Sequence, residues 1–556
     1  MTTEHATKSG ARPEPEPRVT AAALGSDRAI ECRDPATLEL LGSVPVMGPE
    51  QVRAVVARAR VAQRDWSTTS FAERRAVMRA LLDAILARQA EICRLCVRDS
   101  GKTMVDAELG EILPVCEKLR YVMAHGERDL APERRASGPL AHKRARVEYE
   151  PLGVVGVLCP WNFPFHNLYC PLVPALFAGN AVVAKVSEWT SWSAAALVAI
   201  VRDVLRERGH SPDLVGLVTG YGETGAALVS GGVDKVFFTG SPENGKKVME
   251  TAARSLTPVV LELGGKDPMI VCDDADLDHA ARQAMLGVFT ACGQMCVGAE
   301  RIYVHAGVYD AFLEKVTRSV RALRQGPAPL FEAGPADPSR RELVDVGAMT
   351  MPRQLEILEA LVGDAVQKGA RVLVGGKRAA GLGGQFFEPT LLVDVTHAMR
   401  ITQEEQFGPI MVVMRFGSDQ EAVRLANDCP YGLGASVFSR DAARAARITR
   451  EVRAGMAVVN DYGLAYMIQS LPFGGIGRSG FGRINGREGL RACCHTKALV
   501  TDRVPLGAGV AVYPVRRETF GVLEHAARLV YGRGLGTRAQ AALGAARAVV
   551  RMLRGR

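Results

Sequence analysis

From residue 147 onward the chain alternates short apolar runs with helical stretches, and this alternation restricts its fold more than any other feature. Such runs are typical of strands buried on both faces of a parallel sheet. The helical stretches between them, such as 191–208 and 222–230, give repeated β-α-β units. We therefore predict an α/β fold with doubly wound parallel sheets, which bind ligands at the carboxyl ends of their strands. The expected strands are residues 154–159, 181–185, 214–219, 235–239, 259–263 and 269–271.

Helical patterns also lie on both sides of these strands. Residues 49–64 and 71–98 precede them, and apolar side chains recur at helical spacing in the longer stretch. A second α/β region follows, in which we expect helices at 277–292 and 308–324 and a Pro- and Gly-rich surface loop at 327–340. A chain of 556 residues is too long for one hydrophobic core, so we expect two or three domains.

Charge and cysteine content exclude several classes of protein. The net charge is +9, and residues 516–556 contribute nine Arg against two Glu, so that 9 − 7 leaves +2 on the rest. A nearly neutral body gives no support to nucleic-acid binding. No apolar run approaches the roughly 18–20 residues that span a bilayer, and the N-terminus lacks a secretion signal. The twelve cysteines show no disulfide framework, which favours a reduced, cytoplasmic protein. Cys93 and Cys96 have the spacing of a redox or metal motif, but they lie in a helical apolar pattern without a second such pair or a His pair nearby, so we expect no metal site.

The stretch 289–301 is where we expect the chemistry. It places Cys296 between Gly293 and Gly298, so the backbone around this thiol carries little side-chain bulk. A cysteine attacks electrophilic carbon as the thiolate. Free cysteines are nevertheless common core residues, so the prediction depends on partners elsewhere in the chain.

Three other stretches offer such partners. Glu262 interrupts an apolar strand, where it is either paired with a cation or acts as a general base whose pKa is raised by burial. Asn162 follows the strand 154–159, and its amide can serve as a turn residue or donate to an oxyanion. Residues 235–245 form a strand, a Gly-containing turn and a helix start, where backbone amides and Ser241 can hold a phosphate.

Over roughly residues 30–500 the chain resembles the aldehyde dehydrogenase superfamily, in a less characterised branch with a C-terminal extension. The motifs that carry the resemblance occur in the family's order. They are Pro160-Trp-Asn-Phe-Pro164, Lys185-Val-Ser-Glu188, Phe238-Thr-Gly-Ser241 with Gly245, Glu262-Leu-Gly-Gly-Lys266, Gly293-Gln-Met-Cys296, Glu404-Glu-Gln-Phe-Gly-Pro409 and Pro472-Phe-Gly-Gly475.

The resemblance implies an NAD(P)-dependent oxidation of an aldehyde to the acid. Cys296 is implied to be the nucleophile, Glu262 the general base, and Asn162 with the Cys296 amide the oxyanion hole. Attack on the aldehyde gives a thiohemiacetal, hydride loss gives a thioester, and water activated by Glu262 hydrolyses it.

The resemblance also assigns the cofactor residues. A carboxylate at Glu188 accepts hydrogen bonds from a ribose 2′-hydroxyl and repels a 2′-phosphate, whereas Lys185 partly offsets that repulsion. We therefore expect NAD, with NADP as the alternative. The residues implied to bind the cofactor are Trp161, Lys185, Glu188, Gly240, Ser241, Gly245, Glu405 and Phe407.

The substrate pocket that the resemblance implies is mostly apolar, which favours a medium-chain aliphatic or aromatic aldehyde. Its expected lining residues are Phe163, Asn167, Cys170, Met295, Val297 and Phe473. Cys292 lies four residues before Cys296, and we hypothesise that the two thiols can form a protective or inactivating disulfide.

The implied domain organisation has five parts. The edges of the predicted arm pair between subunits, which gives a homodimer or homotetramer. Helical spacing in the extension favours a helix pair that packs on the enzyme body or a neighbouring subunit, with peripheral contact to an anionic membrane as the alternative. The parts are an unstructured lead (1–22), a dinucleotide-binding domain (23–140 and 151–264), a catalytic domain (265–476), an oligomerisation arm (141–150 and 490–505) and a basic amphipathic helical extension (510–556).

Three other functions compete with this prediction. A relative that acylates coenzyme A or reduces an activated acid would generally lack the base, so Glu262 argues against it. A catalytically silent nucleotide-binding scaffold would have no need to retain Cys296, Glu262 and Asn162 together. A Cys-His hydrolase needs a histidine beside the sulfur, and His166, the one histidine within a motif, has the neighbours of a turn residue.

Overall fold

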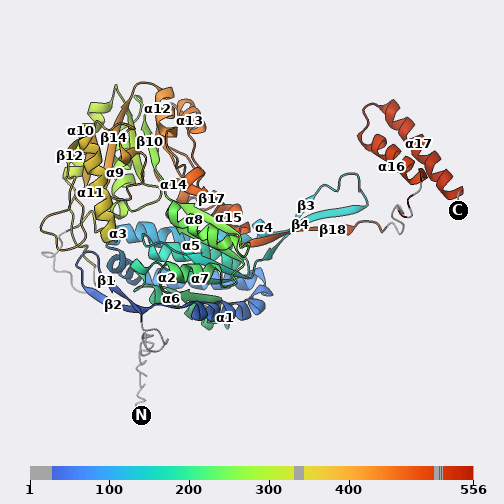
Figure 1. The fold of residues 1–556 in the computed structure, drawn as a ribbon, viewed down its shortest axis with the longest axis horizontal. Coiled ribbons are helices and arrows are strands. Elements are labelled where there is room, and N and C mark those ends of the chain that lie inside the picture. Colours follow the sequence, from blue (N-terminus) through green and yellow to red (C-terminus); the bar gives the residue numbers. More distant parts are fainter. Residues whose placement is uncertain (1–27, 331–342, 506–512, 514, 516, 555–556) are drawn as a thin grey trace, which may run out of the picture. The chain divides into compact units, whose positions relative to one another are not determined.

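The computed structural model describes residues 28–330, 343–505, 513, 515 and 517–554 (Figure 1). The lead predicted at 1–22 and most of the loop predicted at 327–340 lie outside the described residues. The chain divides into two compact units, which are described separately. The first comprises Met1–Leu130 and Pro151–His495, and the second comprises Ala131–Glu150 and Thr496–Arg556.

A six-stranded sheet forms the first half of unit 1. Its order is β17-β9-β8-β5-β6-β7, and only β17 runs antiparallel to its neighbour. The chain starts in the middle at β5, builds outward to β7, and then returns to β8, so β5 and β8 flank the point where the strand order reverses. Ligands bind in the crevice at such a point. The strands are β5 (Val154–Leu158), β6 (Ala181–Lys185), β7 (Val215–Val218), β8 (Lys235–Gly240), β9 (Val259–Leu263) and β17 (Gly480–Phe481).

Helices cover this sheet. The long helix α2 is capped at both ends: the Ser70 side chain accepts from the Glu73 amide before its first turn, and Gly101, with a φ of 80°, follows its last residue. A five-residue π-helical segment, η2 (Glu108–Ile112), interrupts the helical run before α4. The helices are α1 (Pro49–Ser67), α2 (Phe71–Ser100), α3 (Met104–Ala107), α4 (Leu113–Leu130), α5 (Pro164–Phe177), α6 (Ala194–Glu207), α7 (Gly222–Val229) and α8 (Pro242–Ala253).

A seven-stranded sheet in the order β12-β13-β14-β11-β10-β15-β16 forms the second half of unit 1, and β12 is its antiparallel edge. Its residues supply a large buried core. The strands are β10 (Asp267–Val271), β11 (Ala299–His305), β12 (Arg371–Val374), β13 (Thr390–Val393), β14 (Ile410–Phe416), β15 (Ser436–Phe438) and β16 (Val458–Val459). The helices are α9 (Leu277–Phe289), α10 (Tyr309–Arg321), α11 (Pro352–Gln367), α12 (Asp419–Asn427) and α13 (Ala442–Glu451). Two short helices, α14 (Leu464–Met467) and α15 (Gly486–Arg491), contact α4 of the first half.

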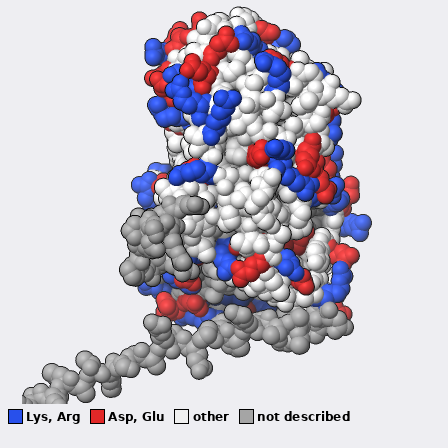
Figure 2. All heavy atoms as spheres, turned by 90° about the vertical axis from the view of Figure 1, so that its left-hand side faces the viewer, with Lys and Arg blue, Asp and Glu red and all other residues white. Residues whose placement is uncertain are grey.

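The doubly wound α/β architecture predicted from the sequence is confirmed by these two sheets. Several predicted helix boundaries are wrong by three residues. α9 ends at Phe289 rather than at residue 292, with a 3-10 turn at Thr290–Gly293, α6 begins at Ala194 rather than at 191, and α10 ends at Arg321 rather than at 324. The sequence also missed the hairpin of β1 (Ala29–Arg33) and β2 (Leu40–Pro45), which turns through Leu38 at a φ of 62°. On the face of the molecule in Figure 2, basic and acidic side chains are interspersed over the described residues.

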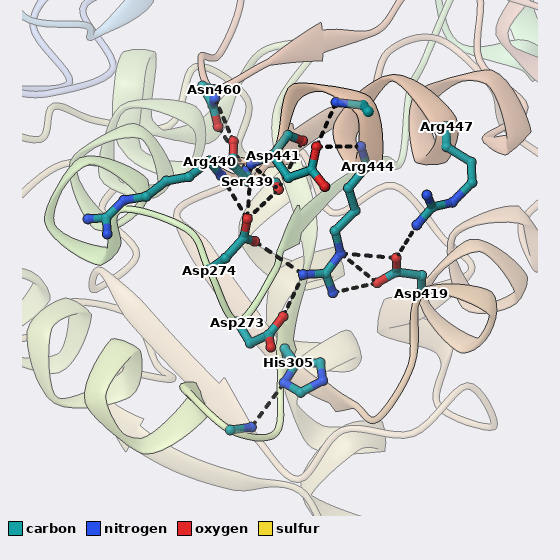
Figure 3. Close-up of polar contacts among 12 residues, drawn as sticks. Asp273, Asp274, His305, Asp419, Ser439, Arg440, Asp441, Arg444, Arg447 and Asn460 are labelled. Carbon is teal, nitrogen blue, oxygen red and sulfur yellow. Dashed lines mark hydrogen bonds and ion pairs between the residues drawn. The ribbon is translucent and has the colours of Figure 1, made fainter.

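An ion-pair network joins two helices and one turn beside the second sheet (Figure 3). Arg444 of α13 lies 2.6 Å from Asp419 at the start of α12, 2.6 Å from Asp273 and 3.2 Å from Asp274, both in the turn after β10. Its hydrogen bonds lower the pKa values of Asp419 and Asp273. Arg447 lies 2.8 Å from Asp419 at the rim of the network.

Because the Arg444 side chain is only 19% exposed, Arg444→Met should lower the free energy of unfolding by about 2–3 kcal/mol. Its carboxylate partners have lowered pKa values, so the loss should be full near neutral pH and should disappear as pH falls through those values. Thermal unfolding at several pH values measures it. Arg447→Met is the matched control, because this arginine is 55% exposed, and should cost less than about 1 kcal/mol. Equal losses for the two variants would contradict this account.

Unit 2 holds a three-stranded sheet and a helical hairpin. The sheet has the order β18-β4-β3, from β3 (Glu133–Arg135), β4 (Lys143–Pro151) and β18 (Cys494–Asp502). The hairpin consists of α16 (Arg517–Tyr531) and α17 (Leu535–Arg554). Among the described residues, none of the helices combines the length and the apolar character needed to cross a bilayer.

Candidate functional site

Two cavities of unit 1 meet at the carboxyl ends of β5, β8 and β9. The larger, called the groove here, has a volume of about 1150 Å³, and the smaller, called the tunnel, has a volume of about 150 Å³ and an almost entirely apolar lining. The residues that line both cavities mark the junction between them. They are Leu158, Asn162, Phe238, Thr239, Glu262 and Cys296. The three residues expected to do the chemistry therefore lie together where the cavities join.

Cys296 lies in the loop between α9 and β11, and this loop has an unusual backbone. Ala291, Cys292 and Gly293 have φ values of 50°, 58° and 72°, three consecutive residues in the left-handed region. Each non-glycine residue there costs roughly 1 kcal/mol, so the surrounding contacts must hold the loop. Gln294 provides them, because its side chain donates to the carbonyls of Ala291 and Ala348 and accepts from the Thr350 amide at 2.9 Å.

The neighbouring Cys292 lies in the core. Its sulfur is fully buried, 3.5 Å from the sulfur of Met349, and both Cys292 and Cys296 are free thiols. A disulfide between the two cysteines would require Cys292 to leave this position, and it stays a prediction.

The thiol of Cys296 and the carboxyl of Glu262 interact directly. Each of the two groups shifts the pKa of the other, and Glu262 is 4% exposed at the end of β9. Burial raises the pKa of Glu262 to about 7, against the hydrogen bond from Cys296, which lowers it. Burial and the charge of Glu262 hold the pKa of the Cys296 thiol well above its usual value. Within the described part of the chain, Oε1 of Glu262 is buried without a hydrogen-bond partner, so it can accept from a water or a thiol.

The side-chain amide of Asn162 is held in one orientation. Its Oδ1 accepts from Nδ2 of Asn167 at 2.9 Å, and its own Nδ2 donates to the carbonyl of Gln294 at 2.9 Å. An amide nitrogen has two donor hydrogens, so one remains for a ligand at the junction. Asn167, expected only to line the substrate pocket, thus also fixes the Asn162 amide.

A buried ion pair lies behind Asn162 and was missed by the sequence analysis. Lys102, 1% exposed, pairs with Glu111, which is fully buried, and its Nζ donates to the Asn162 carbonyl at 2.7 Å. Glu111 accepts from the His166 amide at 2.8 Å, and the Lys102 ammonium lies 4.2 Å from the ring centroid of Phe163. The pair therefore holds both ends of the turn that carries Asn162.

The groove contains most of the residues expected to bind the cofactor. Ser241 is the N-cap of α8 and accepts from the Asn244 amide, so the helix start faces the groove with Gly240 beside it. A side chain at Gly240 would approach the Phe238 ring to 2.6 Å. Gly245 does not line the groove, and instead its lack of a side chain lets α8 approach Leu263 of β9.

The two ends of the groove have different chemistry. At one end Nζ of Lys185 lies 3.3 Å from Oε2 of Glu188, next to the wall formed by α7. At the other end the rings of Trp161 and Phe407 meet edge to face with centroids 5.4 Å apart. Glu405 lines this end and accepts from the Gly265 amide at 2.9 Å.

A second buried ion pair orders the loop that carries Glu405 and Phe407. Lys266 lies 2.8 Å from Glu300, and Glu300 accepts from the amides of Gln406 and Phe407. Phe407 has a φ of 48°, a conformation that side chains rarely adopt without such support. Lys266 belongs to a sequence motif, but nothing in the sequence indicated its pairing with Glu300.

The tunnel is lined by all six residues expected at the substrate pocket, Phe163, Asn167, Cys170, Met295, Val297 and Phe473. Two further features were not expected. Gly110 of the π-helical segment lies so close to Phe163 that a side chain there would approach the ring to 2.3 Å. The Tyr466 hydroxyl bonds both the His166 imidazole and, at 2.9 Å, the Cys170 sulfur.

His166 was expected in a turn, and this is wrong: it lies in the first turn of α5 and is buried. Burial lowers the pKa of its imidazole to about 3, so the ring is neutral and can accept from Tyr466. Its hydrogen-bonding capacity is directed to Tyr466 rather than to Cys296. This geometry gives no support to a Cys-His hydrolase.

Comparison with known proteins gives one consistent result. Residues 23–499 match the model of the aldehyde dehydrogenase family. An aldehyde dehydrogenase-like protein of Schizosaccharomyces pombe is 42% identical over 479 residues, covering 85% of this chain and 90% of that protein. The 4,4'-diapolycopene aldehyde oxidase of Methylomonas is 36% identical and covers 85% and 86%. The crystal structure of betaine aldehyde dehydrogenase from Staphylococcus aureus with NAD+ has a TM-score of 0.78 at 31% identity, over 86% of this chain and 93% of that one.

Proposed function

The chain belongs to the aldehyde dehydrogenase family, and we propose that Cys296, Glu262 and Asn162 carry out its oxidation of an aldehyde to the carboxylic acid. The enzyme is an NAD(P)-dependent aldehyde dehydrogenase. The observation that carries the proposal is the meeting of these three side chains where the groove joins the tunnel. A dinucleotide in the groove and an aldehyde in the tunnel would each reach Cys296 from one side.

The first half of the reaction needs a thiolate and a stabilised oxyanion. Glu262 takes the proton of the Cys296 thiol, and the sulfur attacks the carbonyl carbon to give a thiohemiacetal. The oxyanion accepts from the free Nδ2 hydrogen of Asn162 and from the backbone amide of Cys296. Bound nicotinamide supplies the acceptor for the hydride that leaves this carbon, which converts the thiohemiacetal into a thioester.

The second half is hydrolysis. Once the proton from Cys296 has passed to solvent, Glu262 takes a proton from a water molecule and the hydroxide adds to the thioester carbon. The carbon–sulfur bond then breaks to release the acid, and the Cys296 thiolate takes up the proton held by Glu262. A base at this position supports hydrolysis over transfer to coenzyme A. Added coenzyme A should therefore leave the steady-state rate unchanged.

The groove fits a dinucleotide. Its volume of about 1150 Å³, the start of α8 at Ser241 and the uncovered backbone at Gly240 suit a pyrophosphate. We assign Trp161, Glu405 and Phe407 to the nicotinamide ribose end, and Lys185 with Glu188 to the adenosine ribose. The Glu188 carboxylate favours NAD, because a 2′-phosphate would meet a like charge.

The tunnel favours an uncharged aldehyde. Its volume of about 150 Å³ and apolar lining suit a single aromatic ring or a chain of similar size. The proposal is tested by following NADH formation with hexanal, benzaldehyde and succinate semialdehyde, with NAD and with NADP. We expect the highest kcat/KM for the two uncharged aldehydes with NAD. No NADH with any aldehyde would refute the function, and a preference for the semialdehyde would refute the substrate class.

The rate should depend on the ionisation of Glu262. Its pKa of about 7 means that the base is protonated in acid and ionised above neutrality, so kcat should rise about tenfold between roughly pH 6 and pH 8. Steady-state rates at saturating NAD and aldehyde measure the profile. A kcat that stays flat over this range would contradict Glu262 as the base in the rate-limiting step.

The ion pair behind Asn162 acts as a positioning device. Lys102→Met combined with Glu111→Gln removes both charges, and should lower kcat about 10- to 100-fold because the Asn162 turn loses its anchors. The Kd for NAD, measured by quenching of Trp fluorescence, should stay unchanged. The single variant Lys102→Met leaves Glu111 unpaired and should also lower the thermal midpoint. A loss of stability without loss of kcat in either variant would show that the pair is only structural.

The roles of the domains and the assembly of subunits follow from the proposed cofactor and catalytic residues. We propose that residues 23–140 and 151–264 bind the dinucleotide, that 265–476 carry the catalytic cysteine, and that 141–150 with 490–505 form an oligomerisation arm. The strands β18 and β3 are edges of the three-stranded sheet, and such edges pair between subunits. All twelve cysteines are free, in keeping with the proposed cytoplasmic location.

A further inference from the structure

The helical hairpin of α16 and α17 lies beyond residues 23–499, the part that matches the family, and the reaction makes no use of it. Its two helices are antiparallel. Contacts pair Gly532 with Thr537, His525 with Gly544, and Gly521 with Ala548. The interface is formed by small residues and by the ring of His525, which lies so close to Gly544 that a side chain there would collide with it. The two helices therefore contact each other mainly through small residues, and most of their large apolar side chains are exposed to solvent.

Each helix exposes a second apolar stripe. On α16 it includes Phe520, Leu523, Val530 and Tyr531, which recur at helical spacing, with Phe520 69% and Tyr531 75% exposed. On α17 it includes Leu535, Leu543 and Val550, with Leu535 86% and Leu543 62% exposed. Tyr531 and Leu535 flank the turn between the helices. A globular protein seldom leaves so many large apolar side chains in water without a partner surface.

The charge of the hairpin indicates the nature of that surface. Residues 516–556 carry nine Arg and two Glu, a net charge of +7, whereas the rest of the chain carries +2. A second copy of the hairpin would bring like charges together. The nearly neutral body supplies no excess of negative charge either. The complement to a basic helix pair with exposed aromatic and aliphatic side chains is an anionic, partly apolar surface from outside the chain.

We propose that the hairpin docks the enzyme on the surface of an anionic phospholipid bilayer. The two apolar stripes enter the boundary between headgroups and acyl chains, as amphipathic helices do, and the Arg side chains contact lipid phosphates. Phe520, Tyr531 and Leu535 provide the insertion, while Arg538, Arg547 and Arg551 provide the electrostatic attraction. The helices lie on the bilayer and do not cross it.

The test uses the full-length enzyme and sedimentation with sucrose-loaded vesicles. One set contains phosphatidylcholine alone and the other about one-third phosphatidylserine. We expect binding to the anionic vesicles to exceed binding to the neutral ones at least about tenfold, and to weaken as salt is raised. One variant combines Phe520→Ser, Tyr531→Ser, Leu535→Ser and Leu543→Ser, and another combines Arg538→Gln, Arg547→Gln and Arg551→Gln.

Both variants should lose the binding at least about tenfold, whereas Gln540→Ala, an exposed polar control on α17, should bind like the wild type. The substituted side chains are exposed, and Arg538 donates to the Gly532 carbonyl at 3.0 Å, a bond that the amide of glutamine can also make. Helical circular dichroism and turnover of a water-soluble aldehyde should therefore not change. The proposal is overturned if the wild type does not sediment with anionic vesicles, or if the serine variant binds as well as the wild type. A smaller oligomer in the serine variant, without any vesicle binding by the wild type, would identify a second copy as the partner.

Discussion

Cys296→Ala should abolish NADH formation, with a loss in kcat of at least about 10⁴-fold. The thiol is the one group at the junction of groove and tunnel that forms a covalent bond with the aldehyde, and alanine offers no substitute. The Kd for NAD should change little, because the groove is lined mainly by other residues. Absorbance at the NADH band and fluorescence titration with NAD measure the two quantities.

Cys116→Ala is the matched control. Cys116 is a partly exposed thiol of α4 that lines neither cavity, so its loss should leave kcat within about twofold. Retention of a substantial rate by Cys296→Ala would refute covalent catalysis at this position. Equal losses in the two variants would point to damaged folding rather than to missing chemistry.

Glu262→Gln should separate the two halves of the reaction. The amide cannot take a proton from water, so we expect steady-state kcat to fall about 10²- to 10⁴-fold. The thiolate can still form slowly as pH is raised, since glutamine removes the negative charge that raises the pKa of Cys296. Rapid mixing with NAD and hexanal should therefore give a burst of up to one NADH per active site, followed by a stall.

Glu314→Gln, on the exposed surface of α10, serves as the control and should show no separate burst beyond that of the wild type. A Glu262→Gln enzyme that turns over continuously at an unchanged rate would exclude Glu262 as the base. A variant without a burst that also fails to bind aldehyde would show that Glu262 is required earlier than hydrolysis.

Local sequence patterns were sufficient to predict most of the first sheet, and the family resemblance supplied the candidate site residues. Strands buried on both faces leave continuous apolar runs, so β5 to β9 were located within one or two residues. Cys296, Glu262 and Asn162 each follow or end such an element, and the family motifs fix their order. The structure then brings them to one junction.

What the sequence could not predict depends on contacts between distant segments. In the sequence, Lys102 and Glu111 are charged residues near helix ends without any motif. Only the fold brings them together and places Lys102 in contact with the Asn162 carbonyl. The left-handed backbone at Ala291 and Cys292 has no local signal, since neither residue favours that conformation; Gln294 and its distant partners impose it. Tertiary contacts override local preference at these positions.

For the hairpin of α16 and α17, the sequence predicted the helices but not which of their faces pack together. Helical spacing predicted two amphipathic helices at 510–556, but each helix has apolar residues on more than one side, so the pattern alone did not say which stripe joins the helices. The contacts of Gly521, His525 and Gly544 assign the small residues to the interface and leave the large ones exposed. This assignment is what changes the favoured partner from the enzyme body to a membrane surface.

The most direct test of the central claim is the mass of the protein trapped during turnover. Glu262→Gln mixed with NAD and hexanal, then quenched in acid and digested, should carry the hexanoyl group on the peptide that contains Cys296, at close to one group per chain. The Cys292 thiol, on the same stretch, should remain unmodified because it is buried against Met349. An acyl group on any other residue, or NADH formation without a covalent adduct, would contradict the proposed thioester at Cys296.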